Sequence, residues 1–342
     1  MNEFETCALA HVKEKARVRE KEARAYVAAL GADADFLAAR LLDRPVTLNF
    51  HPDRYCADGR QVMEGLAADG AYRGQFETGT TNGGRTAYAG GDRFLWEQRL
   101  FSDAYPPDAR RRPKYGALNA LNLLDGASAR FGSCFLTLKP SVLPRLTFAY
   151  GDSSSDPEIL CTADSFSGIV AALLRDAVQN GRFLNRENVS LDEALRLIAE
   201  PPAPEIGRNL DHCVEAHVHG AVSLREDAAA LHLDAAFRGT ETARRAEALS
   251  DAFHVPLFWI PERRLAVDEI GDQFRGPAMR PLAARVDRLA GGGGYVNAAR
   301  IGAASRGSVD FPENWRDMGD EPALFQFFKQ LWHTTAFFGH CL

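Results

Sequence analysis

Three ionisable side chains in one short segment have a spacing that could carry chemistry. Glu215, His217 and His219 alternate with apolar residues, so in a strand all three lie on one face. A carboxylate on a rigid strand can stabilise a developing positive charge or accept a proton, and Gly220 permits close approach of a ligand. The pattern makes this face a candidate functional site, with Glu215 and His217 as the candidate catalytic residues. A solvent-facing strand without a catalytic role is the other interpretation.

A glycine-rich segment could bind phosphate. The sequence YRGQFETGTTNGG covers residues 72–84 and contains four glycines. Backbone N–H groups of such a loop can surround a phosphate, and an arginine can bind it through two hydrogen bonds. The polar residues that this interpretation assigns to a ligand are Arg73, Glu77, Thr78 and Asn82. A tight turn with solvated side chains is the other interpretation.

Two further segments combine charge or hydroxyl groups with glycine. RRRPKYGALN (residues 110–119) places Tyr115 among positive charges that could attract a dinucleotide, and RFGSC (residues 130–134) places Arg130 and Ser133 beside a glycine. The sequence has no GxGxxG after a strand, no P-loop lysine, no HExxH and no GxSxG. A nicotinamide dinucleotide would therefore not be held as in a Rossmann dehydrogenase.

The elements that must position these residues include both strands and helices. Val46–His51 alternates strictly, which predicts a half-buried strand with Thr47, Asn49 and His51 on one face. Val214–Leu224 is predicted as a longer strand that pairs antiparallel with Leu231–Leu233. The other predicted strands cover residues 130–138 and 145–150, and the predicted helices cover residues 8–30, 35–42, 168–180, 190–200 and 241–253.

This order of elements predicts an α+β protein. A helical N-terminal segment (1–45) is followed by a catalytic domain (46–239) with a helical insertion at about 164–200, and then by a mainly helical C-terminal region (240–342). Gly291–Gly294 is predicted to be a linker or a mobile loop.

Composition excludes several classes of protein. The net charge of −6 argues against a dedicated nucleic-acid binder, and the six cysteines form no CxxC pair, which argues against a zinc ribbon or a dithiol site. No apolar run approaches the ~18 residues of a membrane span. The polar, charged N-terminus lacks the features of a secretory signal, so we expect a cytoplasmic protein or one delivered by specialised secretion into a host cytoplasm.

Five segments together resemble one bacterial family. LNFHP (48–52), YRGQFETGTTNGG (72–84), RPKYGALN (112–119), RFGSC (130–134) and VEAHVHG (214–220) are similar to the CteC-like effectors, ADP-ribosyltransferases that modify a threonine of host ubiquitin. The resemblance implies a sheet core like that of other ADP-ribosyltransferases, NAD as substrate, ubiquitin as protein acceptor and no metal. Transfer of ADP-ribose would then block ubiquitin conjugation.

The resemblance also implies roles for individual residues. Glu215 matches the catalytic glutamate of transferases, His51 resembles a histidine that holds the adenosine ribose, and Tyr115 resembles a tyrosine that stacks on nicotinamide. Other transferases use an arginine and a serine instead, and here Arg73 or Arg130 with Ser133 would take those roles. His217 and Cys213 stand where a second acidic residue or glutamine is usual, which is a departure from the pattern.

Two other functions fit parts of the sequence. A metal-dependent hydrolase could use the His217/His219 pair with one of His51, Asp211, His212 or Asp234. A non-catalytic module could bind a partner through the aromatic residues of the C-terminal third, although core packing explains most such residues. These aromatic residues are Phe258, Trp259, Trp315, Phe325, Phe327, Phe328, Trp332, Phe337 and Phe338.

Overall fold

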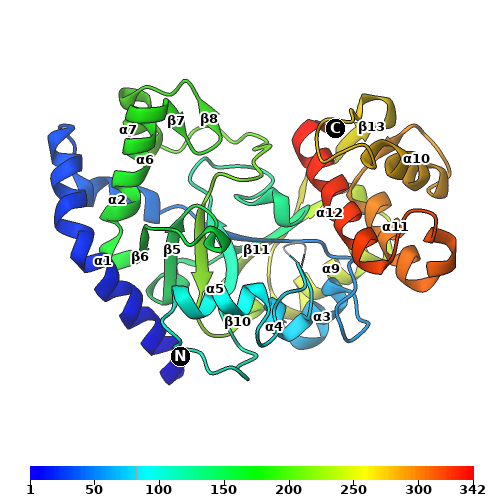
Figure 1. Cartoon of the computed structure of the whole chain (residues 1–342), viewed down its shortest axis with the longest axis horizontal. Coiled ribbons are helices and arrows are strands. Elements are labelled where there is room, and N and C mark those ends of the chain that lie inside the picture. The colour runs from blue at the N-terminus through cyan, green and yellow to red at the C-terminus, as the bar shows by residue number, and fades with distance from the viewer. Residues whose placement is uncertain (82–83) are drawn as a thin grey trace.

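The computed structural model describes residues 1–81 and 84–342, and its centre is an eight-stranded mixed sheet (Figure 1). Neighbouring strands run antiparallel except β11 and β12, which are parallel. This confirms the predicted α+β class, with a sheet core and helices at both ends of the chain. In spatial order the strands are β12 (Leu257–Ile260), β11 (Ala228–Asp234), β4 (Cys134–Leu138), β1 (Val46–Phe50), β3 (Lys114–Leu118), β9 (Val214–Val218), β5 (Leu146–Tyr150) and β6 (Leu160–Thr162).

Three groups of helices surround this sheet (Figure 1). The first group packs near β5 and β6 and contains α1 (Glu3–Ala29), α2 (Ala34–Leu42), α6 (Ser167–Asn180) and α7 (Leu191–Ala199). The second pairs α3 (Val62–Asp69) with α9 (Glu241–Phe253), and the third joins α10 (Met279–Leu289), α11 (Ala298–Asp310) and α12 (Glu321–Phe338). No described helix is long and apolar enough to cross a membrane.

The remaining elements are short. The helices among them are α4 (Gln75–Thr78), α5 (Asp92–Leu100) and α8 (Leu224–Asp227). The strands are β2 (Ala71–Tyr72), β7 (Arg182–Phe183), β8 (Arg186–Glu187), β10 (Val222–Ser223), β13 (Arg263–Ala266), β14 (Tyr295–Val296) and β15 (His340–Cys341). Of these, α4 and α5 matter most for the site, because they lie in the segment between β1 and β3.

The candidate residues of the central strands share one face. Directly opposite residues of an antiparallel pair lie on the same face, and both Tyr115 on β3 and Thr147 on β5 lie opposite His217 on β9. Glu215, two residues earlier on β9, shares this face. Every residue of β1 and β9 is nevertheless buried, so the prediction of a half-buried strand at Val46–His51 is wrong. The reason is that the rest of the chain covers both faces of the central strands.

The predicted strand Val214–Leu224 is wrong in its length and in its partner. β9 ends at Val218, and the chain turns at Gly220, whose φ of +87° lies in the left-handed region. β9 lies between β3 and β5, whereas Leu231–Leu233 belongs to β11, which pairs with β4 and β12. Alternation of apolar and polar residues assigns the two faces of a strand, but it does not identify the neighbouring strands.

The predicted helices are confirmed, although α1 begins at Glu3 instead of Ala8 because Asn2 and Glu5 form a reciprocal capping box. The predicted strand at 130–138 is shorter than expected. Residues 129–131 form a 3₁₀ turn, and Gly132 lies so close to β1 that a Cβ there would overlap the backbone of Phe50. This contact holds residues 129–133 against the end of β1.

The C-terminal region is joined to the sheet. β12 lies beyond residue 239, yet it pairs with β11 in the central sheet. α11 packs against the loop that follows β1, where Arg306 forms an ion pair with buried Asp53 (2.5 Å) and Tyr55 donates a hydrogen bond to Asp310 (3.2 Å). The loop Gly291–Gly294 connects α10 to β14, and all four of its glycines have positive φ. The helices α10–α12 are therefore fixed next to the face that carries the candidate residues.

The nine C-terminal aromatic residues divide between the core and the surface: three are buried, three are half-buried and three, including Phe258, are exposed. Trp315, Phe328 and Trp332 are buried in the main hydrophobic cluster, which confirms the expectation of core packing for them. Phe337 and Phe338 are partly exposed at the end of α12.

Gly302 on α11 is the point where this helix comes closest to the loop after β1. A Cβ at Gly302 would overlap the carboxylate of Asp53. We therefore expect Gly302→Ala to lower the free energy of unfolding by about 1–3 kcal/mol, measured by denaturant unfolding. Gly307→Ala is the matched control, because a Cβ there meets no atom within 4 Å and alanine favours the helix by about 0.5–1 kcal/mol. Equal effects of the two substitutions would contradict this packing.

Candidate functional site

One large pocket opens beside the face that carries Glu215. Its volume is about 710 Å³, which lies in the range of small-molecule sites. Its walls come from the ends of β1, β3 and β9, from the segment between β1 and β3 that includes α5, and from α11 and α12. The predicted site residues that line it are His51, Arg73, Thr78, Tyr115, Arg130 and Glu215.

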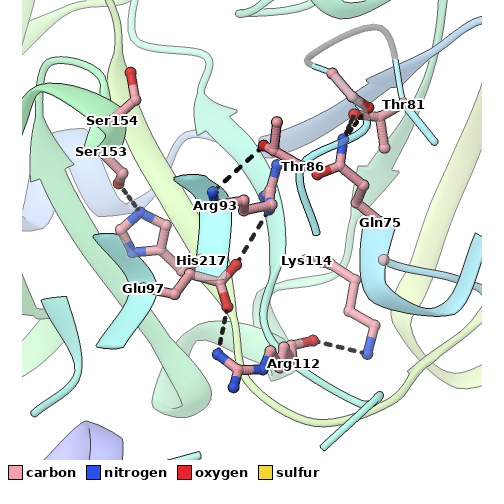
Figure 2. Close-up of polar contacts among 12 residues, drawn as sticks. Gln75, Thr81, Thr86, Arg93, Glu97, Arg112, Lys114, Ser153, Ser154 and His217 are labelled. Carbon is pink, nitrogen blue, oxygen red and sulfur yellow. Dashed lines mark hydrogen bonds and ion pairs between the residues drawn. The ribbon is translucent and has the colours of Figure 1, made fainter. Parts of the chain in front are cut away.

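Glu215 is the carboxylate that the central sheet presents to the pocket. Its side chain is 8% exposed, and its Oε1 accepts a hydrogen bond from Ser153 and lies 2.8 Å from His217 Nε2. Ser153 Oγ also lies 2.8 Å from His217 Nε2. Figure 2 marks this contact with a dashed line. Ser153 and His217 together hold Oε1 in place. Oε2 forms no hydrogen bond with a described residue, so it is available to a ligand.

The pocket is cationic, although the chain carries a net charge of −6. Its described lining residues include nine lysine and arginine side chains and four carboxylates. Seven of the eight arginines form an ion pair with a described carboxylate; Arg73, for example, lies 2.7 Å from Asp69, and Arg130 lies 2.8 Å from Asp211. Arg54 is the exception, since no hydrogen bond or ion pair joins its guanidinium to another described residue.

Arg54 and His51 form a polar corner that lacks a partner. Burial lowers the pKa of Arg54 to about 10 and outweighs the attraction of the neighbouring Asp53, so this residue remains a cation at neutral pH at a cost in free energy. His51 is buried, and its Nε2 has no hydrogen-bond partner among the described residues. Burial also holds the pKa of His51 well below its usual value, so its imidazole is neutral. An anionic ligand that also carries hydroxyl groups would satisfy both side chains.

Tyr115 is held by a buried ionic network. The Arg93 guanidinium lies 4.1 Å from the centre of the Tyr115 ring, and Trp96 meets that ring edge-on at 5.4 Å. Glu97 on α5 forms ion pairs with Arg93 (3.2 Å) and with the buried Arg112 (3.3 Å). Figure 2 shows this carboxylate between the two guanidinium groups. The network fixes α5 and the Tyr115 ring relative to each other.

Three predicted site residues do not line the pocket, and a fourth is not described. Glu77 caps α4 and forms an ion pair with buried Lys114 (3.3 Å), so it has a structural partner. Ser133 lines a second cavity of only about 10 Å³. His217 is fully buried next to Glu215 and contacts the Tyr115 ring edge-on. Asn82 lies outside the described residues.

The histidine pair does not offer free nitrogen atoms to a metal ion. Thr147 Oγ1 lies 2.8 Å from His217 Nδ1 and 3.0 Å from His219 Nε2, and Tyr105 Oη lies 2.7 Å from His219 Nδ1. His217 Nε2 is occupied by Glu215. A metal ligand needs a free imidazole lone pair, and the described residues contain no group of three or more potential ligands arranged for a metal. No observation therefore favours the metal-dependent hydrolase.

Asp234, one of the residues considered for a metal, lies in the small second cavity near Arg263. Burial raises the pKa of its carboxyl group from 3.8 to about 7. The folded state therefore binds more protons than the unfolded state between these values, and Asp234 lowers the free energy of unfolding progressively as the pH rises through that window.

We expect Asp234→Asn to be more stable than the unaltered protein at about pH 8, by on the order of 2–4 kcal/mol. Asparagine keeps the oxygen that accepts the hydrogen bond from the Ala236 N–H but cannot ionise. At about pH 4 both proteins carry a neutral side chain, so the difference is expected to shrink. Denaturant unfolding at the two pH values measures it, and a difference that does not change with pH would contradict the assignment.

These observations define an α+β protein with a cationic pocket between a mixed sheet and C-terminal helices, and with one glutamate of the sheet facing that pocket. The chain belongs to the family described as "Protein of unknown function (DUF3626)", which matches residues 45–338. The match covers β1 through α12 and therefore includes every wall of the pocket. A comparison with curated proteins finds no match.

Proposed function

We propose that this protein is a mono-ADP-ribosyltransferase that transfers ADP-ribose from NAD to a protein hydroxyl group, with a threonine of ubiquitin as the acceptor. The observation that carries the proposal is that Glu215, fixed through Oε1 by Ser153 and His217, leaves Oε2 free toward a cationic pocket of about 710 Å³. A dinucleotide carries the negative charge that such a pocket favours.

Glu215 is suited to the chemical step. The bond between nicotinamide and ribose breaks, its electron pair leaves with nicotinamide, and positive charge develops on the ribose. A carboxylate in a water-poor site stabilises that charge. The acceptor oxygen then forms the new bond to the ribose carbon, and its proton passes to Glu215 and onward to solvent.

The other pocket residues are suited to holding NAD. Arg54 would pair with the pyrophosphate, because its guanidinium has no partner among the described residues and phosphate oxygens accept two hydrogen bonds from arginine. The neutral His51, with its free Nε2, would bind a ribose hydroxyl. The Tyr115 ring, held by Arg93 and Trp96, would stack on a flat ring of the dinucleotide.

The identity of the acceptor as ubiquitin rests on the resemblance to CteC-like effectors. Delivery of the protein into a host cytoplasm is proposed on the same resemblance. The C-terminal region (240–342) lies outside the five segments that carry the resemblance, and we propose that it recognises the acceptor. Because Arg306 on α11 and Phe325 on α12 also line the pocket, we propose that this region contributes to NAD binding as well. Deletion of the C-terminal region would therefore also remove part of the pocket. Point substitutions on the exposed surface of this region are the better test of acceptor recognition.

Release of nicotinamide from NAD tests the reaction class without an acceptor. The purified protein is incubated with NAD alone and then with NAD and ubiquitin, and nicotinamide is measured by chromatography. Release that requires an intact Glu215 supports the proposal. Undiminished release by Glu215→Gln would reject Glu215 as the catalytic group, and no release under either condition would reject NAD chemistry.

A further inference from the structure

A buried chain of hydrogen bonds runs from Glu215 away from the pocket. His217 Nε2 lies 2.8 Å from Glu215 Oε1, and His217 Nδ1 lies 2.8 Å from Thr147 Oγ1. The same threonine oxygen lies 3.0 Å from His219 Nε2, and His219 Nδ1 lies 2.7 Å from Tyr105 Oη. Thr147 and both histidines are completely buried, and Tyr105 is nearly so. Thr147 and His219 therefore depend on their neighbours in the chain for their side-chain hydrogen bonds, whereas Glu215 and His217 also contact Ser153.

Aromatic rings seal this chain. The Phe101 ring contacts both imidazoles edge-on, at 5.6 Å from His217 and 5.1 Å from His219 between ring centres. The Tyr115 ring contacts His217 at 4.9 Å. The other polar group that reaches the two ends of the His217–Glu215 bond is the Ser153 hydroxyl, which donates to Glu215 Oε1 and lies 2.8 Å from His217 Nε2. The positions of the protons are therefore set by the chain together with Ser153.

An ionised carboxylate accepts hydrogen bonds and cannot donate them, and with a neutral imidazole at His217 this places every proton in the chain. His217 must carry its proton on Nε2 to donate to Glu215, so its Nδ1 is a lone pair that accepts from the Thr147 hydroxyl. Having given its one proton to His217, Thr147 can only accept from His219 Nε2–H. His219 Nδ1 then accepts from the Tyr105 hydroxyl.

The opposite arrangement of protons is energetically less favourable for two reasons. A proton on His217 Nδ1 would point the lone pair of Nε2 at the carboxylate of Glu215, 2.8 Å away. Ser153 could donate to that lone pair only by giving up the hydrogen bond that it donates to Glu215 Oε1, because a hydroxyl group has a single proton. It would also reverse the remaining bonds, so that Tyr105 accepts from His219 and its own hydroxyl proton finds no acceptor among the described residues. The first arrangement leaves every donor of the chain satisfied.

We infer that Thr147 is a positioning residue: its hydroxyl holds His217 in the Nε2–H tautomer, so that His217 donates to Glu215 and keeps Oε2 aimed at the pocket. This inference rests on the proposed function, because it is the ionised Glu215 that the reaction needs. Thr147 does not line the pocket, so it acts on the reaction only through His217. The sequence offers no pattern that marks this residue.

The first test determines the tautomer of His217 spectroscopically and does not require any enzymatic reaction. The protein is labelled with ¹⁵N at its histidines, and long-range ¹H–¹⁵N correlation spectra at neutral pH distinguish the two neutral tautomers from the imidazolium. Loss of a signal set in His217→Gln assigns that residue. We expect a neutral Nε2–H form for His217 in the unaltered protein and a shift toward Nδ1–H in Thr147→Val. An Nδ1–H or doubly protonated His217 in the unaltered protein would overturn the inference, whether or not NAD is a substrate.

The second test measures nicotinamide release. Thr147→Val keeps the side-chain volume but removes the hydroxyl, and we expect kcat to fall by about 10- to 100-fold with KM within about twofold, as for other outer-shell hydrogen bonds. Thr147→Ser restores the hydroxyl and is expected to restore most of kcat. An unchanged kcat in Thr147→Val, or a Thr147→Ser variant as impaired as Thr147→Val, would overturn the positioning role while leaving the Glu215 chemistry intact.

Tyr105→Phe keeps the inference testable if Thr147→Val does not fold. This change removes only the last donor of the chain and keeps the ring that stacks on His219. We expect the Nε2–H population of His219 to fall and kcat to decrease by a smaller factor of about 2 to 10. An unaltered His219 tautomer in this variant would contradict the proposed direction of the chain.

Discussion

Glu215→Gln is expected to reduce nicotinamide release and ADP-ribosyl transfer by about 10³-fold or more, which is the scale of losing an electrostatic stabiliser that also serves as base. Glutamine keeps the volume of the side chain, and its amide oxygen can still accept from Ser153 and His217. What it removes is the negative charge next to the reacting ribose. The fold is therefore expected to survive, and both initial rates and thermal unfolding should be measured.

Asp152→Asn is the matched control for this result. Asp152 also lines the pocket, but it lies 3.7 Å from Arg130 and is not on the central sheet. Its substitution is expected to change the rate by less than about tenfold, because its ion pair with Arg130 is half-exposed and asparagine can still accept the hydrogen bond from the Ser154 N–H. A marked fall in Tm for Glu215→Gln would assign Glu215 to a structural network, and equal losses in the two variants would mean that any negative charge in the pocket suffices.

Arg54→Gln is expected to weaken binding of ADP-ribose by about 2–4 kcal/mol, which is roughly 30- to 1,000-fold in Kd. The reason is that Arg54 is the pocket arginine whose charge has no ion-pair partner among the described residues. The same change removes a partly buried charge whose burial outweighs the attraction of the neighbouring Asp53, so the free protein is expected to become more stable. Calorimetric titration with ADP-ribose and thermal unfolding of the ligand-free protein measure the two effects.

Arg73→Gln tests whether this behaviour is special to Arg54. Arg73 lines the same pocket but already pairs with Asp69 at 2.7 Å. Its loss is expected to weaken binding less than the loss of Arg54 and to give no gain in Tm. Unchanged binding of ADP-ribose by Arg54→Gln would remove Arg54 from the phosphate site.

The sequence predicted the helices and strands better than it predicted which strands lie next to each other in the sheet. Capping residues and periodicity are local, so α2, α6, α7 and α9 could be predicted closely, and alternation placed Glu215 and His217 on one face. Strand order depends on long-range pairing, and the position of β9 between β3 and β5 could not be read from the turn at Gly220. The burial of β1 on both faces likewise depends on distant helices.

The site could be predicted only in part for the same reason. Motifs singled out His51, Tyr115 and Glu215, which the fold brings to one pocket. Arg54 carries no motif, because what distinguishes it from other arginines is the absence of a partner among the described residues, and pairing is a property of the folded chain. Ser153 and Thr147 reach His217 only because β5 lies beside β9.

The most direct test of the central claim is the intact mass of ubiquitin after incubation with this protein and NAD. We expect an increase equal to one ADP-ribose, lost with Glu215→Gln and retained with Asp152→Asn. An unchanged mass with nicotinamide still released would reject ubiquitin as the acceptor and keep the NAD chemistry. An unchanged mass with no nicotinamide released would contradict the proposed function itself.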